Sequence, residues 1–177
     1  MAWLGALQYY TGLWQPNMHE VVPQLWLGNL GAAFDKKTLR AYGITHIVSV
    51  TNYGSNVAYY PLEFKYCVLT ADDHPTFQLS TLFKSSNEFI ASALQQGGTI
   101  LIHCKFGRSR SATILAAFLI AHLQFTPMAA FAKLRTARPI VCPNPGFITQ
   151  TYQWAIQTGC FNPTGAEGQT EQFDTAA

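Results

Sequence analysis

The sequence predicts an α/β fold in which helices flank a central, twisted, mostly parallel sheet of four to five strands. Short apolar β runs alternate along the chain with longer segments of helical character. Residues 99–103 (TILIH) form a continuous apolar run, typical of a strand that is buried on both faces of a sheet. With 177 residues, the chain is long enough for one domain with a sizeable core.

Four segments are predicted to be strands, and five are predicted to be helices. The predicted strands cover residues 24–27, 45–50, 65–69 and 99–103. The predicted helices cover residues 36–41, 80–96, 110–123, 127–135 and 145–157. Asp35 is expected to cap the first helix, which Gly43 follows, and Ser80 is expected to cap the second, which ends at Gly97.

The two ends of the chain differ from this pattern. Residues 1–18 are rich in aromatic side chains, and their apolar positions fall near helical spacing: Trp3, Leu4, Leu7, Tyr10, Leu13 and Trp14. A short amphipathic helix that packs on its own domain is expected there, with a contact surface for a partner or a homodimer as the alternative. Residues 158–177 are rich in Gly, Thr, Glu and Gln, and they are expected to be disordered.

The composition excludes several classes of protein. A net charge of +2 is too small to indicate a nucleic-acid partner. The longest nearly apolar run, residues 112–123, is too short for a transmembrane segment, and the N-terminus lacks the basic region of a signal peptide. The four cysteines lack metal-ligand spacing and are expected to be reduced thiols. A cytoplasmic location is therefore expected, with the nucleus as the alternative.

The chemically informative stretch is HCKFGRSRS, residues 103–111, between the last predicted strand and the helix that follows it. In open α/β sheets, ligands bind at such loops, where backbone N–H groups and the positive end of the helix dipole hold an oxyanion. Gly107 permits the turn that points these N–H groups inward, and the Arg110 guanidinium can bind two phosphate oxygens. The same positive field favours the thiolate form of Cys104, a nucleophile for phosphoryl transfer.

The alternative explanation of this stretch is a buried cysteine beside a solvated basic turn. Three basic residues, Lys105, Arg108 and Arg110, lie within six positions. Cations are disfavoured at the N-terminus of a helix, so a purely structural turn would be an unusual place for them. A loop that binds an anion explains the same residues better.

With its flanking residues, HCKFGRSRSAT resembles the signature loop HC-x-x-G-x-S-R-S of the cysteine-dependent protein tyrosine phosphatase superfamily, in its small (atypical) dual-specificity branch. The likeness extends over residues 19–157, through VVPQLWLGNLGAA, GITHIVSV and RPIVCPNPGFITQ. It implies a catalytic domain over residues 19–157, with a shallow pocket and with no metal or other cofactor. It also implies that the loop binds phosphate through Lys105, Phe106, Gly107, Arg108 and Ser109.

An acidic doublet, Asp72–Asp73, follows the predicted strand at 65–69. In the family, an aspartate on the corresponding loop gives a proton to the leaving oxygen. In the small relatives this acid precedes a Phe-x-Leu-Ser run by four residues, and the run FQLS begins here at Phe77, which selects Asp73. Asp72 is expected to make a turn bond or to face solvent, and His74 is expected to be solvated.

Further residues receive roles from the resemblance. The Ser111 hydroxyl would stabilise the Cys104 thiolate when the phosphoenzyme is hydrolysed, and His103 would orient the loop. Asn144 is expected to bond the signature loop, to cap the last helix, or both. Cys67 is expected to be a core residue, with a role as redox partner of Cys104 as the alternative.

The resulting hypothesis is a protein phosphatase that acts on phosphotyrosine and phosphoserine/threonine. The first alternative is a phosphatase of phosphoinositides or other polyanions, because Lys105 and Arg108 resemble basic positions in the loops of lipid-directed relatives. The second is a phosphoprotein-binding module without turnover. Such modules usually lack the cysteine or the arginine, and this chain keeps both.

Overall fold

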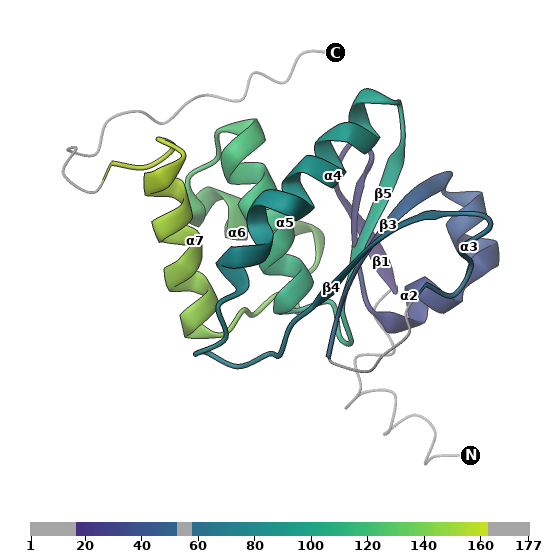
Figure 1. Cartoon of the computed structure of the whole chain (residues 1–177), viewed down its shortest axis with the longest axis horizontal. Helices are drawn as coiled ribbons and strands as arrows, with labels where there is room; N and C mark the ends of the chain where they lie inside the picture. Colours follow the sequence, from purple (N-terminus) through teal and green to yellow (C-terminus); the bar gives the residue numbers. More distant parts are fainter. Residues whose placement is uncertain (1–16, 53–57, 163–177) are drawn as a thin grey trace.

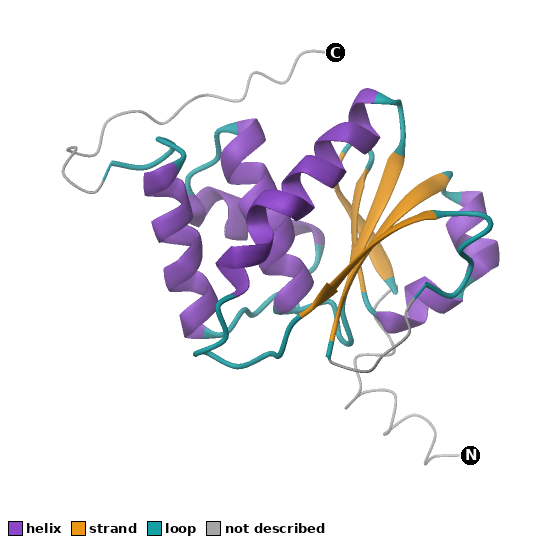
Figure 2. Ribbon diagram, viewed as in Figure 1, coloured by secondary structure: helices purple, strands orange, loops and turns teal. Residues whose placement is uncertain are grey.

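The computed structural model describes residues 17–52 and 58–162, and its five-stranded sheet lies between two layers of helices (Figure 1 and Figure 2). The strands are β1 (Met18–Val22), β2 (Leu25–Gly28), β3 (Ile44–Thr51), β4 (Lys65–Thr70) and β5 (Thr99–His103). Their order across the sheet is β1-β2-β5-β3-β4. Only β1 pairs antiparallel, with β2, while the other pairs are parallel. The mostly parallel sheet predicted from the sequence is therefore confirmed.

The helices divide between the two faces of this sheet. The smaller layer contains α2 (Leu30–Phe34) and α3 (Lys36–Ala41), on the right in Figure 1. The larger layer contains the 3-10 turn η1 (Leu79–Leu82) together with α4 (Phe83–Gln95), α5 (Arg110–Leu123), α6 (Pro127–Ala137) and α7 (Pro145–Gln157). Each layer has its own apolar cluster against the sheet, and the larger cluster includes Cys104.

Helix α5 is the centre of the larger layer. Every residue from Arg110 to Ile120 is buried, and the helix contacts α4, α6 and α7 as well as the sheet. Burial of so many aliphatic side chains stabilises the helix in one position on β5. The loop that enters α5 is fixed at the same time.

Parallel pairing brings three short segments to one edge of the sheet. Cys104 follows β5, Asn52 follows β3, and Asp72 and Asp73 follow β4 by two and three residues. The carboxyl ends of parallel strands meet at the same edge, where open α/β sheets bind their ligands. Residues that lie far apart in the sequence are thereby assembled around Cys104.

Several sequence predictions of single elements agree with the structure. The predicted bounds of β5, α5 and α7 are those observed, and Asp35 caps α3 through its side chain. The predicted helix within residues 1–18 and most of the predicted tail lie outside the described residues. Within the described part of that tail, Cys160 and Phe161 pack against the larger apolar cluster.

Other elements correct the sequence predictions. Strand β1 was not predicted, because the run VVPQLWL reads as one segment, whereas Gln24 adopts a positive φ of 67° and turns the chain into a hairpin. Helix α2 was missed because it has only five residues. Ser80 does not cap a helix: it lies inside the 3-10 turn η1, and α4 begins only at Phe83. Its N–H donates to Gln150 Oε1 of α7 at 2.8 Å. The capping signal at Ser80 therefore falls within a turn and not at the start of a helix.

Across the described residues, the structure contains no helix with the length and apolar character needed to cross a bilayer.

Candidate active site

The signature loop, residues 104–110, surrounds the sulfur of Cys104. Two donors point at this atom: the N–H of Gly107 and the hydroxyl of Ser111, each 3.2 Å from Sγ. Cys104 is 2 % exposed, so the sulfur lies at the bottom of the loop. Both donors are placed to stabilise negative charge that develops on the sulfur during a reaction.

Gly107 is required at its position for two reasons. Its φ of 65° is in the left-handed region that favours glycine, and a Cβ there would overlap with the carbonyl group of Gly28. The turn that follows β2 therefore packs directly against the signature loop. The N–H of Leu30 in α2 strengthens this contact, since it donates to the Lys105 carbonyl at 3.2 Å.

Arg138, at the end of α6, supports the loop from inside the protein. Its Nε donates to the Gly107 carbonyl at 2.9 Å, and its Nη2 donates to the Phe106 carbonyl at 3.2 Å. Its Nη1 lies 3.0 Å from His19 Nδ1 on β1. Burial lowers the pKa of Arg138, and the nearby Cys104 opposes this effect. Sequence reasoning missed Arg138, although it opens the quoted motif RPIVCPNPGFITQ.

Arg110 is anchored by one of its nitrogens. Nη1 donates to the Ala71 carbonyl at 3.1 Å and to Oδ1 of Asn52. Nε is buried and has no hydrogen-bond partner in the described part of the chain, with Oδ2 of Asp73 at 3.8 Å as its nearest ionic neighbour. A guanidinium held in this way keeps its Nε–Nη2 edge for an oxyanion.

The structure separates the two aspartates of the doublet. Oδ1 of Asp73 accepts from the Ser109 hydroxyl at 2.6 Å and from Asn144 Nδ2 at 3.0 Å, which places Asp73 against the signature loop. Oδ1 of Asp72 accepts instead from Asn52 Nδ2 at 3.0 Å. Asp72 is exposed, as expected, but its partner is a side chain on another loop rather than its own turn.

The Asn144 side chain makes two hydrogen bonds, one that caps α7 and one to a residue of the candidate site. Its Oδ1 accepts from the N–H of Phe147 at 3.0 Å, so it caps α7 as predicted. Its Nδ2 bonds Asp73, and not the signature loop as the resemblance implied. The amide reaches the loop only through Asp73, because the acid occupies the space between them.

His103 supports the loop from the sheet. Its Nε2 lies 2.8 Å from the Ser49 hydroxyl on β3, and the side chain is fully buried. Burial lowers its pKa to about 4, against a weaker opposing effect of the Cys104 backbone, so His103 is neutral at physiological pH. His74 is exposed, and its Nδ1 lies 2.9 Å from the Thr76 hydroxyl.

All four cysteines are free thiols. Cys67 packs against the larger apolar cluster, and burial raises the pKa of its thiol. A raised pKa reduces the thiolate fraction that disulfide exchange requires. These properties favour the core role expected for Cys67 over the redox role.

The basic residues of the loop lie on its outer side. Lys105 and Arg108 are exposed, and Phe106 is 49 % exposed. The Lys105 ammonium lies 5.1 Å from the centre of the Phe106 ring, a cation–π contact. The Arg108 carbonyl accepts from the N–H of Cys142 at 2.8 Å, which ties the loop to the segment before α7.

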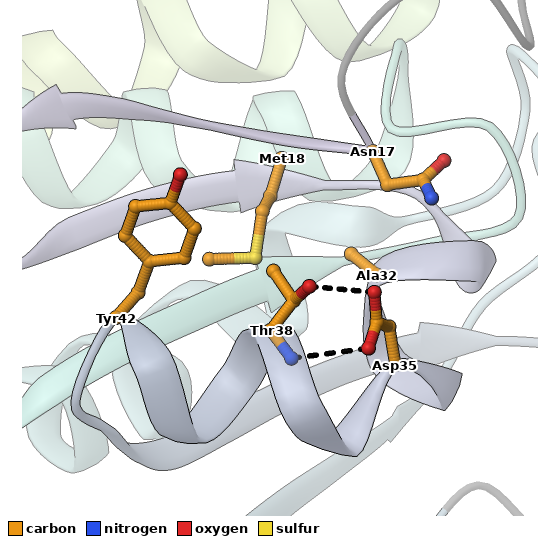
Figure 3. A pocket seen from close by; sticks show the side chains of 6 residues that line it. All are labelled: Asn17, Met18, Ala32, Asp35, Thr38 and Tyr42. Atoms are coloured by element: carbon orange, nitrogen blue, oxygen red, sulfur yellow. Dashed lines mark hydrogen bonds between the residues drawn. The ribbon is translucent and has the colours of Figure 1, made fainter.

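A separate hollow of about 140 Å³ lies beside α2 and α3 (Figure 3). Its lining side chains are those of Asn17, Met18, Ala32, Asp35, Thr38 and Tyr42. The Asp35 carboxylate accepts from the Thr38 N–H at 3.0 Å and from its hydroxyl at 2.6 Å. Both carboxylate oxygens are therefore used for helix capping, and the hollow offers no comparable reactive group.

Cys104 is buried at the bottom of a loop that Arg110 closes, and Asp73 reaches this loop from a neighbouring one. This arrangement is typical of a cysteine-dependent phosphatase site. A model of the dual specificity phosphatase catalytic domain matches residues 25–157. Dual specificity protein phosphatase 26 of Rattus norvegicus is 40 % identical over 146 residues, which cover 80 % of this chain and 69 % of the relative.

Solved structures agree with these sequence matches. Human DUSP28 shares 28 % identity at a TM-score of 0.77, over 82 % of this chain and 97 % of that one. The human tyrosine phosphatase-like serine/threonine/tyrosine-interacting protein shares 31 % identity at a TM-score of 0.76, over 79 % of this chain and 96 % of that one. The chain belongs to the dual specificity phosphatase family. It is a protein phosphatase of the cysteine-dependent type.

Proposed function

We propose that the chain hydrolyses phosphotyrosine and phosphoserine/threonine in proteins through a cysteinyl-phosphate intermediate formed on Cys104. The observation that carries the proposal is the arrangement at the sulfur. Two donors, from Gly107 and Ser111, point at Sγ from 3.2 Å each. Arg110 closes the same loop, and its Nε has no hydrogen-bond partner among the described residues. The nucleophile Cys104 therefore shares one short loop with the groups that would bind the phosphate oxygens, which are the backbone N–H groups of the loop and the Arg110 guanidinium. These oxyanion-binding groups are called the cradle below.

In the first step, the Cys104 thiolate attacks phosphorus, the S–P bond forms, and the bond between phosphorus and the leaving oxygen breaks. The leaving oxygen takes a proton from Asp73, whose bonds to Ser109 and Asn144 hold it against the loop. Backbone N–H groups of the loop and the Nε–Nη2 edge of Arg110 stabilise the charge on the transferred group.

In the second step, water attacks phosphorus, and the S–P bond breaks to release inorganic phosphate. Asp73, now ionised, accepts a proton from the attacking water. The Ser111 hydroxyl, 3.2 Å from Sγ, stabilises the thiolate that leaves. Asp73 thus acts on the leaving oxygen and then on the water, and Ser111 acts on the sulfur. The electron pair of the broken S–P bond returns to sulfur, so the Cys104 thiolate is regenerated.

The exposed rim of the loop supports action on more than one type of phosphorylated side chain. Phe106 and Lys105 are exposed beside the cradle, and the side chain of Asp73 is 34 % exposed. A rim of this kind leaves the sulfur within reach of a short phosphoserine as well as a longer phosphotyrosine. Protein substrates of both types are therefore proposed.

Phosphoinositides remain the second candidate, favoured by the exposed basic side chains of Lys105 and Arg108. We expect kcat/KM to be higher for phosphopeptides than for inositol phospholipids presented in mixed micelles. A preference for the lipids by more than about tenfold would contradict the proposal. Lys105→Ala and Arg108→Ala would then be expected to reduce the lipid activity selectively.

The mechanism is tested by turnover of an aryl phosphate. Cys104→Ser is expected to abolish it, because a serine hydroxyl is not ionised at neutral pH. Cys142→Ser, which changes an exposed cysteine whose N–H bonds the loop, is the matched control and should retain activity. Activity that survives Cys104→Ser, or that requires a divalent metal, would refute the mechanism. A wild-type protein that binds phosphopeptides without turnover would show a binding module instead.

Residues 1–18 are further proposed to contact a partner or a second copy of the chain, on the strength of their aromatic content. Removal of residues 1–16, which leaves β1 intact, should then convert a dimer to a monomer in light scattering, without a loss of aryl phosphatase activity. A cytoplasmic location is proposed from the cysteine usage, and imaging of a tagged full chain tests it.

A further inference from the structure

Asp72, Asn52 and Arg110 form a chain of hydrogen bonds beside the candidate site. Asp72 Oδ1 accepts from Asn52 Nδ2 at 3.0 Å, and Asn52 Oδ1 accepts from Arg110 Nη1. We infer, on the basis of the function proposed above, that Asp72 and Asn52 are positioning residues that hold Arg110 ready to bind the phosphoryl group. Neither of them touches the sulfur or needs to touch the substrate.

The bonds of Arg110 show which part of its guanidinium is fixed. Nη1 carries two hydrogens, and these point to the Ala71 carbonyl and to Asn52 Oδ1. Nε, on the opposite side, is buried and lacks a hydrogen-bond partner among the described residues. The guanidinium is planar, so fixing Nη1 with two acceptors also fixes the direction of the Nε–Nη2 edge. That edge has the fork geometry that binds two oxygens of a phosphate.

Asp72 and Arg110 select the same orientation of the Asn52 amide. An asparagine presents either an acceptor oxygen or a donor NH₂ group, and only the oxygen can bond a guanidinium. The ionised carboxylate of Asp72 is purely an acceptor, so it selects the orientation in which Nδ2 points to it and Oδ1 points to Arg110. Without Asp72, the exposed Asn52 amide can rotate so that its NH₂ group, a donor, faces the Arg110 guanidinium, which is also a donor.

The anchor at Nη1 matters because the other edge of the Arg110 guanidinium changes partner. Arg110 is only 5 % exposed in its side chain and carries its charge among Ala71, Asn52 and the loop. Asp73, at 3.8 Å from Nε, is its ion-pair partner. A substrate phosphate competes for the same Nε, so the anchor on the other side of the guanidinium keeps Arg110 in place while that edge changes partner.

The test measures the affinity of the purified protein for tungstate, a tetrahedral oxyanion, as a competitive inhibitor of aryl phosphate turnover. Asn52→Ala and Asp72→Ala are each expected to weaken tungstate binding by about tenfold and to raise KM with it, as expected for loss of a bond to a charged group. Glu88→Ala is the matched control, because it removes one exposed negative charge on α4. Both Asn52 and Asp72 are exposed, so Tm should stay near the wild-type value.

Exchanging the carboxylate and the amide between positions 72 and 52 tests whether the orientation of the Asn52 amide, and not only the presence of two polar side chains, holds Arg110. Asp72→Asn alone should weaken tungstate binding, because the new amide no longer selects one orientation of Asn52. Combined with Asn52→Asp, it should restore binding to within about threefold of wild type, since the carboxylate at position 52 then accepts from Arg110 and from the amide at position 72. A swapped variant that binds tungstate no better than Asp72→Asn would overturn the inference.

Changes at Arg110 distinguish this inference from the proposed function. Arg110→Lys has no fork, so it should lose most tungstate affinity, and adding Asp72→Ala to it should change the affinity no further. If Arg110→Lys retains wild-type binding and turnover, Arg110 is not the phosphate-binding group, and the inference fails; turnover that survives Cys104→Ser would instead refute the proposed function itself. If Arg110→Lys is impaired while Asn52→Ala and Asp72→Ala bind tungstate like wild type, only the inference fails.

Discussion

The signature loop and the Asp loop (residues 72–78) meet at the candidate site, but they are held in different ways. The signature loop rests on buried groups: the Arg138 guanidinium, the backbone of Gly28 and the start of α5. The Asp loop is mostly exposed, and Asp73 is held by side-chain bonds to Ser109 and Asn144. The cradle is thus part of the core, whereas the acid is attached at the surface.

This difference has a consequence for mutations. Changes to supports of the signature loop should lower stability and activity together, because those supports are buried and would leave polar groups unpaired. Changes to the Asp loop should lower activity while stability stays nearly constant, because surface bonds contribute little to folding. The two loops should therefore respond differently to substitutions of similar size.

The largest expected effect is on turnover. Asp73→Asn should reduce kcat by roughly 10²–10⁴-fold with a poor alkyl leaving group, and by less with an activated aryl phosphate, because only the former needs a proton. Tm should change little, since Asn can keep the bonds to Ser109 and Asn144. Steady-state kinetics with both leaving groups, beside a thermal melt, measure the two quantities.

The neighbouring carboxylate provides the comparison. Asp72→Asn should change kcat far less than Asp73→Asn and should act mainly on KM and on oxyanion affinity, through Asn52 and Arg110. A larger kcat loss in Asp72→Asn, or equal sensitivity of both variants to the leaving group, would show that Asp73 is not the acid.

The next effect is on stability. Arg138→Met keeps much of the buried volume but leaves the carbonyls of Phe106 and Gly107 without this donor, which should cost on the order of 3 kcal/mol of unfolding free energy. Activity should fall as well, because both carbonyls belong to the signature loop. Urea unfolding monitored by the tryptophans measures the free energy.

Arg135→Met is the control for this change. Arg135 is exposed on the same helix, and its Nε bonds the Val141 carbonyl at 3.3 Å. It should lose well under half as much stability as Arg138→Met. Equal losses in both variants, or normal stability of Arg138→Met, would contradict the view that the signature loop is held from the core.

These two loops also show what the sequence can and cannot predict. Cys104, Gly107 and Arg110 lie within seven residues, so their spacing between a strand and a helix was enough to predict the cradle and the fold around it. Asn52 lies 58 residues from Arg110, and Arg138 lies 31 residues from Gly107. The Asn52 contact depends on the parallel order of β5, β3 and β4, and the Arg138 contact depends on the packing of α6. Arg138 opens a motif of the family resemblance, but its spacing from Gly107 does not indicate the contact.

The same limit explains the errors in single elements. Ser80 has the residue type of an N-cap, but it lies inside the 3-10 turn η1, and its N–H bonds Gln150 of α7, 70 positions away. Asn144 has the cap that its position suggested, while its second bond goes to Asp73, a residue 71 positions away. Local signals predicted the backbone well, and the partners of polar side chains required the tertiary structure.

His103 gives a pH dependence to the support of the signature loop. Its pKa falls to about 4 from the ordinary 6.5 because it is buried, so between these values the unfolded chain binds more protons than the folded one. Stability is then complete above pH 6.5 and falls as the pH is lowered toward 4, by about 3 kcal/mol in total. Burial also lowers the pKa values of His19 and His46, and they act in the same direction.

Unfolding free energies at several pH values between about 4 and 7 measure this slope. His103→Gln keeps a group that can bond Ser49 and does not titrate, so its stability should depend less on pH than that of wild type. An unchanged slope in His103→Gln would show that His103 is not protonated on unfolding in this range.

The smallest expected effect concerns Gly146, where α7 meets the Asp loop. A Cβ at this position would overlap with the backbone of Pro75, two residues after Asp73, so Gly146→Ala must push the Asp loop and α7 apart. Because a displacement of about 1 Å at a catalytic group can lower the rate by up to about 10²-fold, kcat should fall by roughly 10-fold or more. Tungstate affinity should stay near wild type, since the signature loop has its own buried supports. Gly31→Ala, where the atoms nearest to an added methyl belong to the side chains of Asn17 and Asn29, is the matched helical control and should leave kcat unchanged. If Gly146→Ala weakens tungstate binding as much as it lowers kcat, the two loops are not held independently, and the acid and the cradle move as one unit.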